Sequence, residues 1–324
     1  MRAKLRSARA RWAGVAALLT LVAVLLYANL TTPDQTVEHP IAHHYDTRDP
    51  RFVRAMTHLF GPPVTAGNRV TALLNGDESF PSMLEAIRSA KRSITLEAYI
   101  FWPDTTGRIF AEALAERARA GVATHLVLDG VGSQKMPDSL IQWMRDAGVQ
   151  VVWFRPVRWY NLDRVNHRTH RKLLVVDGRV GFTGGLGIAD LYRGRAQDRD
   201  HWRDGQFRAE GPVVGQLQAA FLDNWIETGG ELLHGTDYFP PLDSAGGAWA
   251  QGIFSSPGGG TESLRLMFLL AIASAERSIL IGNPYFVPNT LAVEMLVAAR
   301  RRGVEVEIIV PGPITDRQVE AGCI

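Results

Sequence analysis

The chain has 324 residues, a mass of 35.7 kDa and 46% hydrophobic residues, enough for one large or two moderate globular domains, which excludes disorder over most of its length. Its formal net charge of +2 gives no overall preference for nucleic acid or for an acidic partner, so any affinity for phosphate has to be local. The single cysteine, Cys323, excludes an internal disulfide framework and a cysteine-based zinc site.

The first 33 residues have the pattern of a membrane anchor. Five basic residues lie among the first eleven, and no charged residue occurs from Trp12 to Pro33. As a helix this uncharged run is about 33 Å long, enough for the hydrocarbon core of a bilayer. We therefore expect residues 1–33 to form a basic N-terminus and an uncleaved transmembrane helix, with a cleaved signal peptide as the alternative. Because residues 31–50 contain only one basic residue, Arg48, the rest of the chain is expected on the outer face of that membrane.

One α/β unit occurs twice at an offset of 185 residues. Residues 86–101 read AIRSAKRSITLEAYIF, and residues 271–286 read AIASAERSILIGNPYF. In each copy a strand pattern is followed by an amphipathic helix, a glycine and a second apolar run, which predicts the order helix, strand, helix, strand, with both first strands buried. We therefore expect a linker and two α/β domains. The expected ranges are 34–68 for the linker, 69–245 for a complete first domain and 246–324 for an incomplete second domain.

The residues with the clearest chemistry lie in the first domain, within NHRTHRKLLVVDGRVGFTGGLGIAD at 166–190. His170 and Lys172 are two residues apart, so in a strand their side chains project from the same face, and Arg171 projects from the other face. A neutral imidazole can attack phosphorus, and a nearby ammonium can offset the negative charge of the phosphate oxygens. The spacing therefore favours phosphoryl chemistry. The sequence contains no metal-ligand spacing, so neither a metal nor a cofactor is required.

Two turn signals follow this pair. Asp177-Gly178, between two apolar runs, predicts a two-residue hairpin that returns the chain beside the first strand. Gly184 and Gly185 end the return strand, where the backbone can approach a ligand closely and offer N–H groups to an anion. These glycines are therefore candidate phosphate-binding residues.

Two further side chains are candidates for supporting roles. Asp204 lies 34 residues after His170, and its carboxylate could accept the imidazole Nδ1–H and select a tautomer, or it could be an ordinary surface-loop carboxylate. Arg171 flanks the pair and could meet a headgroup phosphate, or it could be an ordinary solvated charge. The residues alone leave both pairs of alternatives open.

The pattern His170-x-Lys172-x-x-x-x-Asp177 with Gly184-Gly185 resembles the signature of the phospholipase D superfamily, and residues from about 79 to 316 resemble its bacterial cardiolipin synthases. The resemblance implies an α/β fold of the phospholipase D-like α/β/α sandwich type. It also implies a phosphohistidine intermediate on one of two motif histidines, with the other as general acid and base. His170 matches the motif histidine, and Lys172 matches the phosphate-binding lysine. Asp177 matches the motif aspartate, and its hairpin position makes it either an orienting residue or only a turn former.

The chain departs from that pattern at two points. Gly187 stands where the superfamily commonly has Asn, so one side-chain contact to phosphate or water is either missing or supplied elsewhere. No second H-x-K-x-x-x-x-D occurs, and the repeat offset places its histidine near position 355, beyond Ile324. The chain is therefore expected to hold one complete domain and an incomplete second repeat.

The resemblance implies a phosphatidyl transferase that condenses two phosphatidylglycerol molecules into cardiolipin and glycerol. The alternatives are a phospholipase D or phosphodiesterase that uses water, and a catalytically silent half-protein that lacks the second motif. The expected partners are the phospholipid substrate and the inner membrane of a bacterial-type cell. A homodimer in which two copies appose their His170 side chains is one way in which the missing second motif could be replaced. No nucleic acid is expected.

Overall fold

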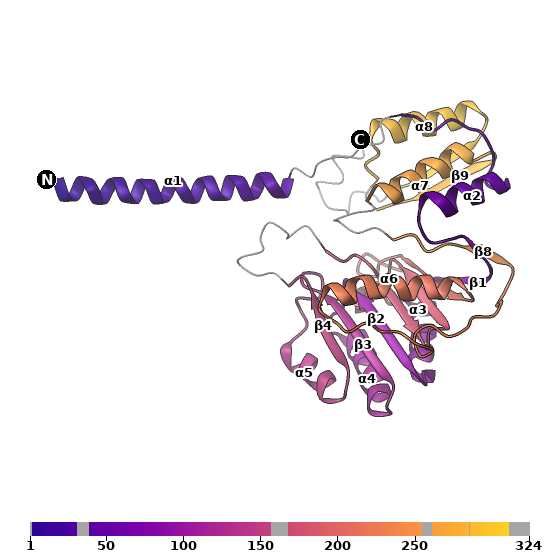
Figure 1. The fold of residues 1–324 in the computed structure, drawn as a ribbon, viewed down its shortest axis with the longest axis horizontal. Coiled ribbons are helices and arrows are strands. Elements are labelled where there is room, and N and C mark those ends of the chain that lie inside the picture. Colours follow the sequence, from indigo (N-terminus) through magenta and orange to yellow (C-terminus); the bar gives the residue numbers. More distant parts are fainter. Residues whose placement is uncertain (1, 31–38, 157–167, 255–260, 285, 311–324) are drawn as a thin grey trace. The chain divides into compact units, whose positions relative to one another are not determined.

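The computed structural model describes residues 2–30, 39–156, 168–254, 261–284 and 286–310 (Figure 1). The chain divides into two compact units. The first comprises residues 1–34 and 66–249, and the second comprises residues 35–65 and 250–324. The predicted motif lies in the first unit.

Helix α1 (Arg2–Leu30) covers most of the predicted uncharged run. Its described side chains, from residue 12 to residue 27, are almost all exposed. Within the described part of the chain, no helix is both long enough and apolar enough to cross a membrane. The predicted transmembrane helix within residues 1–33 is therefore not shown, and neither is the outer-face location inferred from it.

The first unit is built on one mixed sheet with the strand order β4-β3-β2-β5-β6-β7-β1-β8. The first three strands in this order are parallel, and the pairings β2–β5, β5–β6, β6–β7 and β7–β1 are antiparallel. The strands are β1 (Thr65–Leu74), β2 (Ser93–Ala98), β3 (Ala123–Asp129), β4 (Gln150–Phe154), β5 (Leu173–Val176), β6 (Val180–Gly184), β7 (Gly205–Glu210) and β8 (Ala248–Ala250).

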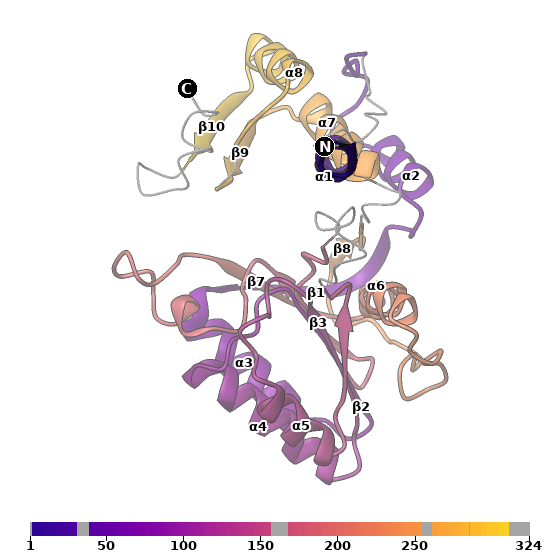
Figure 2. The ribbon, with the colours of Figure 1, turned by 90° about the vertical axis from the view of Figure 1, so that its left-hand side faces the viewer.

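Helices cover both faces of this sheet (Figure 2). On one face lie α3 (Asn75–Ser89), α4 (Thr105–Arg119) and α5 (Asp138–Asp146), and on the other lies α6 (Val213–Glu227). Strand β2 is buried at every position, and its alternating side chains serve the two faces. Leu96 belongs to the core under α3, α4 and α5, whereas Thr95 and Glu97 bond to side chains of α6. This arrangement confirms the predicted sandwich of helices on a sheet.

The second unit repeats part of this order. Its helices and strands are α2 (Pro50–Leu59), α7 (Thr261–Ser274), β9 (Ser278–Gly282), α8 (Thr290–Arg301) and β10 (Glu305–Ile309). The sequence α7-β9-α8-β10 matches α3-β2-α4-β3, and β9 pairs parallel with β10 as β2 does with β3. The duplication therefore has a structural counterpart in the order helix, strand, helix, strand.

Two expectations for the second unit differ from the structure. Strand β9 was expected to be buried like β2, but its residues are exposed or half-buried because β10 is its only paired strand in the described residues. Part of the expected linker, 34–68, is folded: α2 packs on α7, and His43 Nδ1 lies 2.8 Å from the carbonyl oxygen of Ala273. That segment is therefore partly an integral element of the second unit.

Candidate active site

The sheet topology brings the predicted motif to one edge of the first unit. Since β5 is antiparallel to β2, the residues before β5 lie beside the carboxyl ends of β2 and β3. The end of β6 and the start of β7 reach the same edge, because each of these strands reverses the direction of its neighbour. His170 and Lys172 lie just before β5, which begins at Leu173, and not within a strand. The ends of β2, β3 and β6 and the starts of β5 and β7 lie at this edge.

His170 is held against the aromatic ring of Tyr99, which follows β2. The two ring centroids are 4.7 Å apart, and the planes are inclined by 57°. Partial burial lowers the pKa of the imidazole below its ordinary value of 6.5, and the positive charge of Lys172 lowers it further, against the opposing effect of Asp129. His170 is therefore neutral at neutral pH while its side chain still reaches solvent. A neutral, accessible imidazole is the form that acts as a nucleophile.

Lys172 lies on the same side as His170, as the two-residue spacing predicted. Its Nζ is 5.2 Å from the centre of the Tyr99 ring and donates a hydrogen bond of 2.8 Å to the carbonyl oxygen of His170. The residue is buried, and burial lowers the pKa of its ammonium from 10.5 to about 8. Three carboxyl groups, those of Asp204, Asp129 and Glu97, act against this lowering. The result is a buried cation, mostly charged at pH 7, beside the imidazole.

Asp204 is adjacent to this pair, but in a different role from the predicted one. Its Oδ1 accepts a hydrogen bond of 2.7 Å from the backbone N–H of Gly205, and its charge acts on Lys172. Burial raises the pKa of this carboxyl group. No hydrogen bond joins Asp204 to His170 in the described residues, so the predicted choice of imidazole tautomer by Asp204 has no contact to support it. Asp204 is instead a charge partner of Lys172.

At Gly184 and Gly185, neighbouring groups approach the backbone too closely to leave room for a side chain. A Cβ on Gly185 would be 2.0 Å from Asp204 Oδ1, and a Cβ on Gly184 would be 2.4 Å from the carbonyl oxygen of Gly205. The glycines were expected to make room for a ligand. In this structure the room at Gly185 is taken by the Asp204 carboxylate, which brings that carboxylate to the edge that Lys172 occupies.

Gly187 marks the departure from the superfamily pattern. A Cβ there would be 2.8 Å from Ile100 Cβ and 2.9 Å from Tyr192 Cε2. The volume that an Asn side chain would need is thus filled by neighbouring side chains. This arrangement accounts for the glycine at that position.

Asp129 belongs to the site, although the sequence reasoning did not identify it. It ends β3, is fully buried, and accepts hydrogen bonds from the backbone N–H groups of Val131, Gly132 and Thr169 at 2.9, 2.9 and 3.0 Å. Its charge raises the pKa values of both His170 and Lys172. The available signal was an aspartate at the end of an apolar strand, directly before a glycine.

Asp177 lies outside the cluster. It follows β5, at the opposite end of that strand from Lys172, and its carboxylate accepts hydrogen bonds from the backbone N–H groups of Lys91, Arg92 and Ser93. Its φ of 52° and the φ of 61° at Gly178 form the predicted hairpin turn. The grouping of Asp177 with His170 and Lys172 in one catalytic set is therefore not supported, because its position suits a structural role in joining the hairpin to the start of β2.

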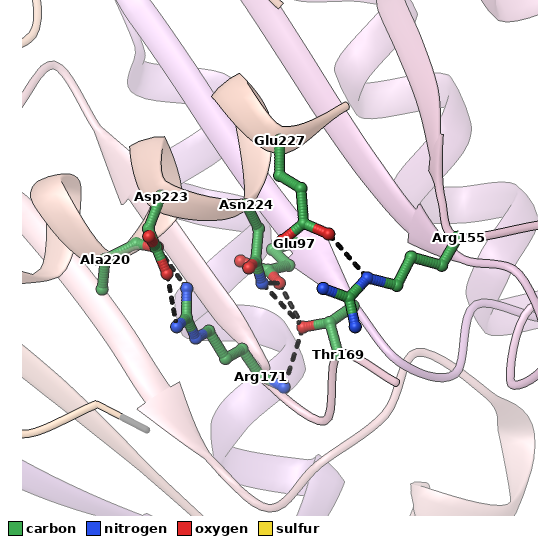
Figure 3. Close-up of polar contacts among 8 residues, drawn as sticks. All are labelled: Glu97, Arg155, Thr169, Arg171, Ala220, Asp223, Asn224 and Glu227. Atoms are coloured by element: carbon green, nitrogen blue, oxygen red, sulfur yellow. Dashed lines mark hydrogen bonds and ion pairs between the residues drawn. The ribbon is translucent and has the colours of Figure 1, made fainter. Parts of the chain in front are cut away.

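Arg171 also faces away from the pair. Its guanidinium donates to the carbonyl oxygen of Ala220 at 2.7 Å and to Asp223 at 2.8 Å, both on α6 (Figure 3). The expected contact with a headgroup phosphate would require this group to leave α6. In the structure Arg171 anchors residues 169–172, the motif segment, to the helix.

The chain resembles known proteins along most of its length. A family model described as "Cardiolipin synthase, PLD-like domain" matches residues 83–191 and 268–321, about half of the chain. Cardiolipin synthase 1 of Bacillus anthracis is 36% identical over 265 residues, which are 78% of this chain and 52% of the relative. Cardiolipin synthase A of Pseudomonas fluorescens is 37% identical over 272 residues, which are 83% of this chain and 56% of the relative. The chain thus spans about half the length of these curated relatives.

A solved structure supports the fold. The phosphatidylserine synthase of Haemophilus influenzae matches 79% of this chain and 65% of its own with a TM-score of 0.56, at 16% sequence identity. That likeness concerns the fold alone. The family match, which includes the segment around His170 and Lys172, and the relatives at 36% and 37% identity show that the chain belongs to the phospholipase D-like domain family of the cardiolipin synthases.

Proposed function

We propose that this chain carries one half of a phosphatidyl-transferase site that condenses two phosphatidylglycerol molecules into cardiolipin and glycerol. The observation that carries the proposal is the pairing of the accessible, neutral imidazole of His170 with the buried ammonium of Lys172. The similarity to cardiolipin synthases supports the choice of substrate class. That similarity, and not the geometry of the pair, favours an acyl-glycerol phosphodiester over a simple phosphate ester.

In the first step, a ring nitrogen of His170 attacks the phosphorus of phosphatidylglycerol. The new N–P bond forms as the bond between phosphorus and the headgroup oxygen breaks, and glycerol leaves with a proton from a general acid. The resemblance assigns that acid to the histidine of a second motif, and we propose that the His170 of a second copy of the chain takes this role. Lys172 offsets the negative charge that collects on the phosphate oxygens during the attack.

In the second step, a hydroxyl group of another phosphatidylglycerol attacks the same phosphorus. The N–P bond breaks, the hydroxyl proton passes to the group that earlier acted as the acid, and cardiolipin leaves with His170 restored. Attack by water in place of the alcohol would give phosphatidic acid, so the fate of the intermediate separates a transferase from a hydrolase.

The test is product analysis with the full chain in phosphatidylglycerol vesicles. Wild-type protein is expected to form cardiolipin and glycerol, and mass spectrometry of quenched digests is expected to find a phosphatidyl adduct on His170. His170→Ala removes both signals and leaves the thermal transition nearly unchanged, because the side chain is exposed. Phosphatidic acid as the main product, or turnover retained in His170→Ala, would contradict the proposal.

We further propose that helix α1 keeps the site at its lipid substrate. Its described side chains include exposed apolar groups along its length, namely Trp12, Val15, Leu18, Leu19, Leu21, Val22, Val24, Leu26 and Tyr27. Basic residues precede them and favour an anionic lipid surface. Flotation with phosphatidylglycerol vesicles checks this role, and Leu18→Asp with Val22→Asp is expected to release the protein from the lipid fraction. Unchanged flotation of that variant would assign membrane binding to another part of the chain.

A further inference from the structure

The residues around the motif alternate between two sides of the sheet. Leu173 packs in the core beneath α6, whereas Leu174 packs beneath α3, α4 and α5. The same alternation continues before the strand, where Thr169 and Arg171 turn toward α6 and Lys172 turns toward Tyr99. The motif segment therefore presents one set of side chains to the site and the other to α6.

On the α6 side, three buried polar side chains meet (Figure 3). The Thr169 hydroxyl and the Asn224 amide both donate to Oε1 of Glu97, and Asn224 Nδ2 also lies 3.0 Å from Thr169 Oγ1. The exposed fractions are 0% for Glu97, 3% for Thr169 and 4% for Asn224. The triad thus joins β2, the motif segment and α6 out of contact with water.

Thr169 is held from its backbone as well as from its side chain. Its N–H donates to Asp129 at 3.0 Å, and its Oγ1 accepts a hydrogen bond of 3.3 Å from the N–H of Arg171. The backbone on either side of His170 is therefore fixed by two buried carboxyl groups, those of Asp129 and Glu97. The carbonyl oxygen of His170, between these anchors, is the acceptor of the Lys172 ammonium.

Burial of three polar side chains costs free energy of folding, so their retention here needs an explanation. Burial raises the pKa of Glu97, and its Oε2 has no hydrogen-bond partner in the described residues. An apolar trio of the same volume would pack at this position without that penalty. Hydrogen bonds, in contrast to apolar contacts, fix direction and register, and the segment they fix here carries the imidazole and the ammonium.

We propose that Glu97, Thr169 and Asn224 are positioning residues that hold the segment from His170 to Lys172 so that imidazole and ammonium address one phosphate. The effect on turnover rests on the proposed function of His170, whereas the effect on the segment does not. None of the three touches the reacting atoms. Their removal is therefore expected to reduce kcat with little change in KM.

The experiment compares three variants with the wild-type full chain. Thr169→Val keeps the side-chain shape and removes the hydroxyl, Thr169→Ser keeps the hydroxyl, and Asn224→Leu breaks the triad from α6. The control is Glu227→Gln on α6, the helix that also carries Asn224. It removes the ion pair between Glu227 and Arg155 and leaves the triad intact. Two readouts are taken: cardiolipin formation, and deuterium exchange of backbone amides in a peptide covering residues 168–174.

Thr169→Val and Asn224→Leu are expected to lower kcat by about 10- to 100-fold and to speed exchange in the 168–174 peptide, because a small misplacement of catalytic groups has effects of this size. Thr169→Ser and Glu227→Gln are expected to resemble the wild type. Unchanged exchange and kcat in folded Thr169→Val would overturn the proposal. So would unfolding of both triad-breaking variants, because the triad would then serve stability alone. If the wild type makes no cardiolipin, the proposed function fails, and the exchange readout still tests the positioning role.

Discussion

The Nζ of Lys172 donates a hydrogen bond of 2.8 Å to the carbonyl oxygen of His170, two residues earlier in the chain. The ammonium is thereby fixed to the backbone that carries the imidazole, and burial lowers its pKa from 10.5 to about 8. The imidazole has its own pKa lowered below 6.5. The two groups therefore titrate on opposite sides of neutral pH, with the imidazole uncharged and the ammonium charged between them.

The rate of phosphatidyl transfer is expected to follow a bell-shaped pH profile. The rate rises with pH as His170 loses its proton below pH 6.5, and falls as Lys172 loses its proton near pH 8. The Asp204 carboxylate raises the pKa of Lys172, so Asp204→Asn is expected to move the alkaline limb to lower pH. Initial rates measured from pH 5 to 9.5 check this. Asp200→Asn, which removes an 82% exposed carboxylate, is the matched control and should leave the limb in place.

Gly185→Ala is expected to displace the Asp204 carboxylate, since the new Cβ would lie 2.0 Å from its Oδ1. We expect the free energy of unfolding to fall by about 1–3 kcal/mol, as for other overpacked sites, together with a shift of the alkaline limb. Gly205→Ala is the control, because a Cβ there meets nothing within 4 Å. Urea unfolding and pH profiles of both variants provide the measurement. Equal behaviour of the two alanine variants would show that Asp204 does not depend on the glycine.

Asp177→Ala is expected to affect stability rather than chemistry. The substitution leaves three backbone N–H groups without their carboxylate acceptor, which costs about 2 kcal/mol of unfolding free energy. Asp177→Asn keeps an acceptor oxygen and tolerates the φ of 52°, so its loss should be smaller. Both variants are expected to retain kcat at temperatures where they are folded. A loss of turnover as large as that of His170→Ala, at unchanged stability, would return Asp177 to the catalytic set.

The local parts of this structure could be predicted from the sequence. The Asp177-Gly178 turn, the strands on either side of it and the common side of His170 and Lys172 depend on neighbouring residues only. The order of elements in the two repeats also follows from periodicity. In these places the propensities of adjacent residues and the packing agree.

The partners that complete the site could not be predicted in this way. Glu97 meets Asn224 across 127 residues, and Arg171 meets Asp223 across 52 residues. These pairings depend on which face of β2 turns toward α6 and on how far α6 extends along the sheet. From the sequence alone, Arg171 is therefore expected to be a solvated charge or a phosphate contact, and Glu97 is only one polar residue in a strand that is expected to be buried. Asp129 was missed for the same reason, since its partner Thr169 is 40 residues away.

His125 provides a last prediction, on stability in acid. Its ring lies 4.9 Å from that of Trp225, its Nε2 is 2.8 Å from the Tyr238 hydroxyl, and burial lowers its pKa from 6.5 to about 4. Between these two pH values the unfolded chain binds a proton at this position and the folded chain does not. Stability is therefore lost as the pH falls from 6.5 to 4, by up to about 3 kcal/mol from this group.

His125→Phe keeps the ring beside Trp225 and removes the titrating group. The variant is expected to be less stable than the wild type at pH 7.5, because the Tyr238 hydroxyl loses its partner, but to lose less further stability on acidification. Urea unfolding at pH 7.5, 6, 5 and 4.5 gives the two slopes. Parallel slopes in variant and wild type would mean that His125 takes up its proton in the folded state, and that acid sensitivity originates elsewhere in the chain.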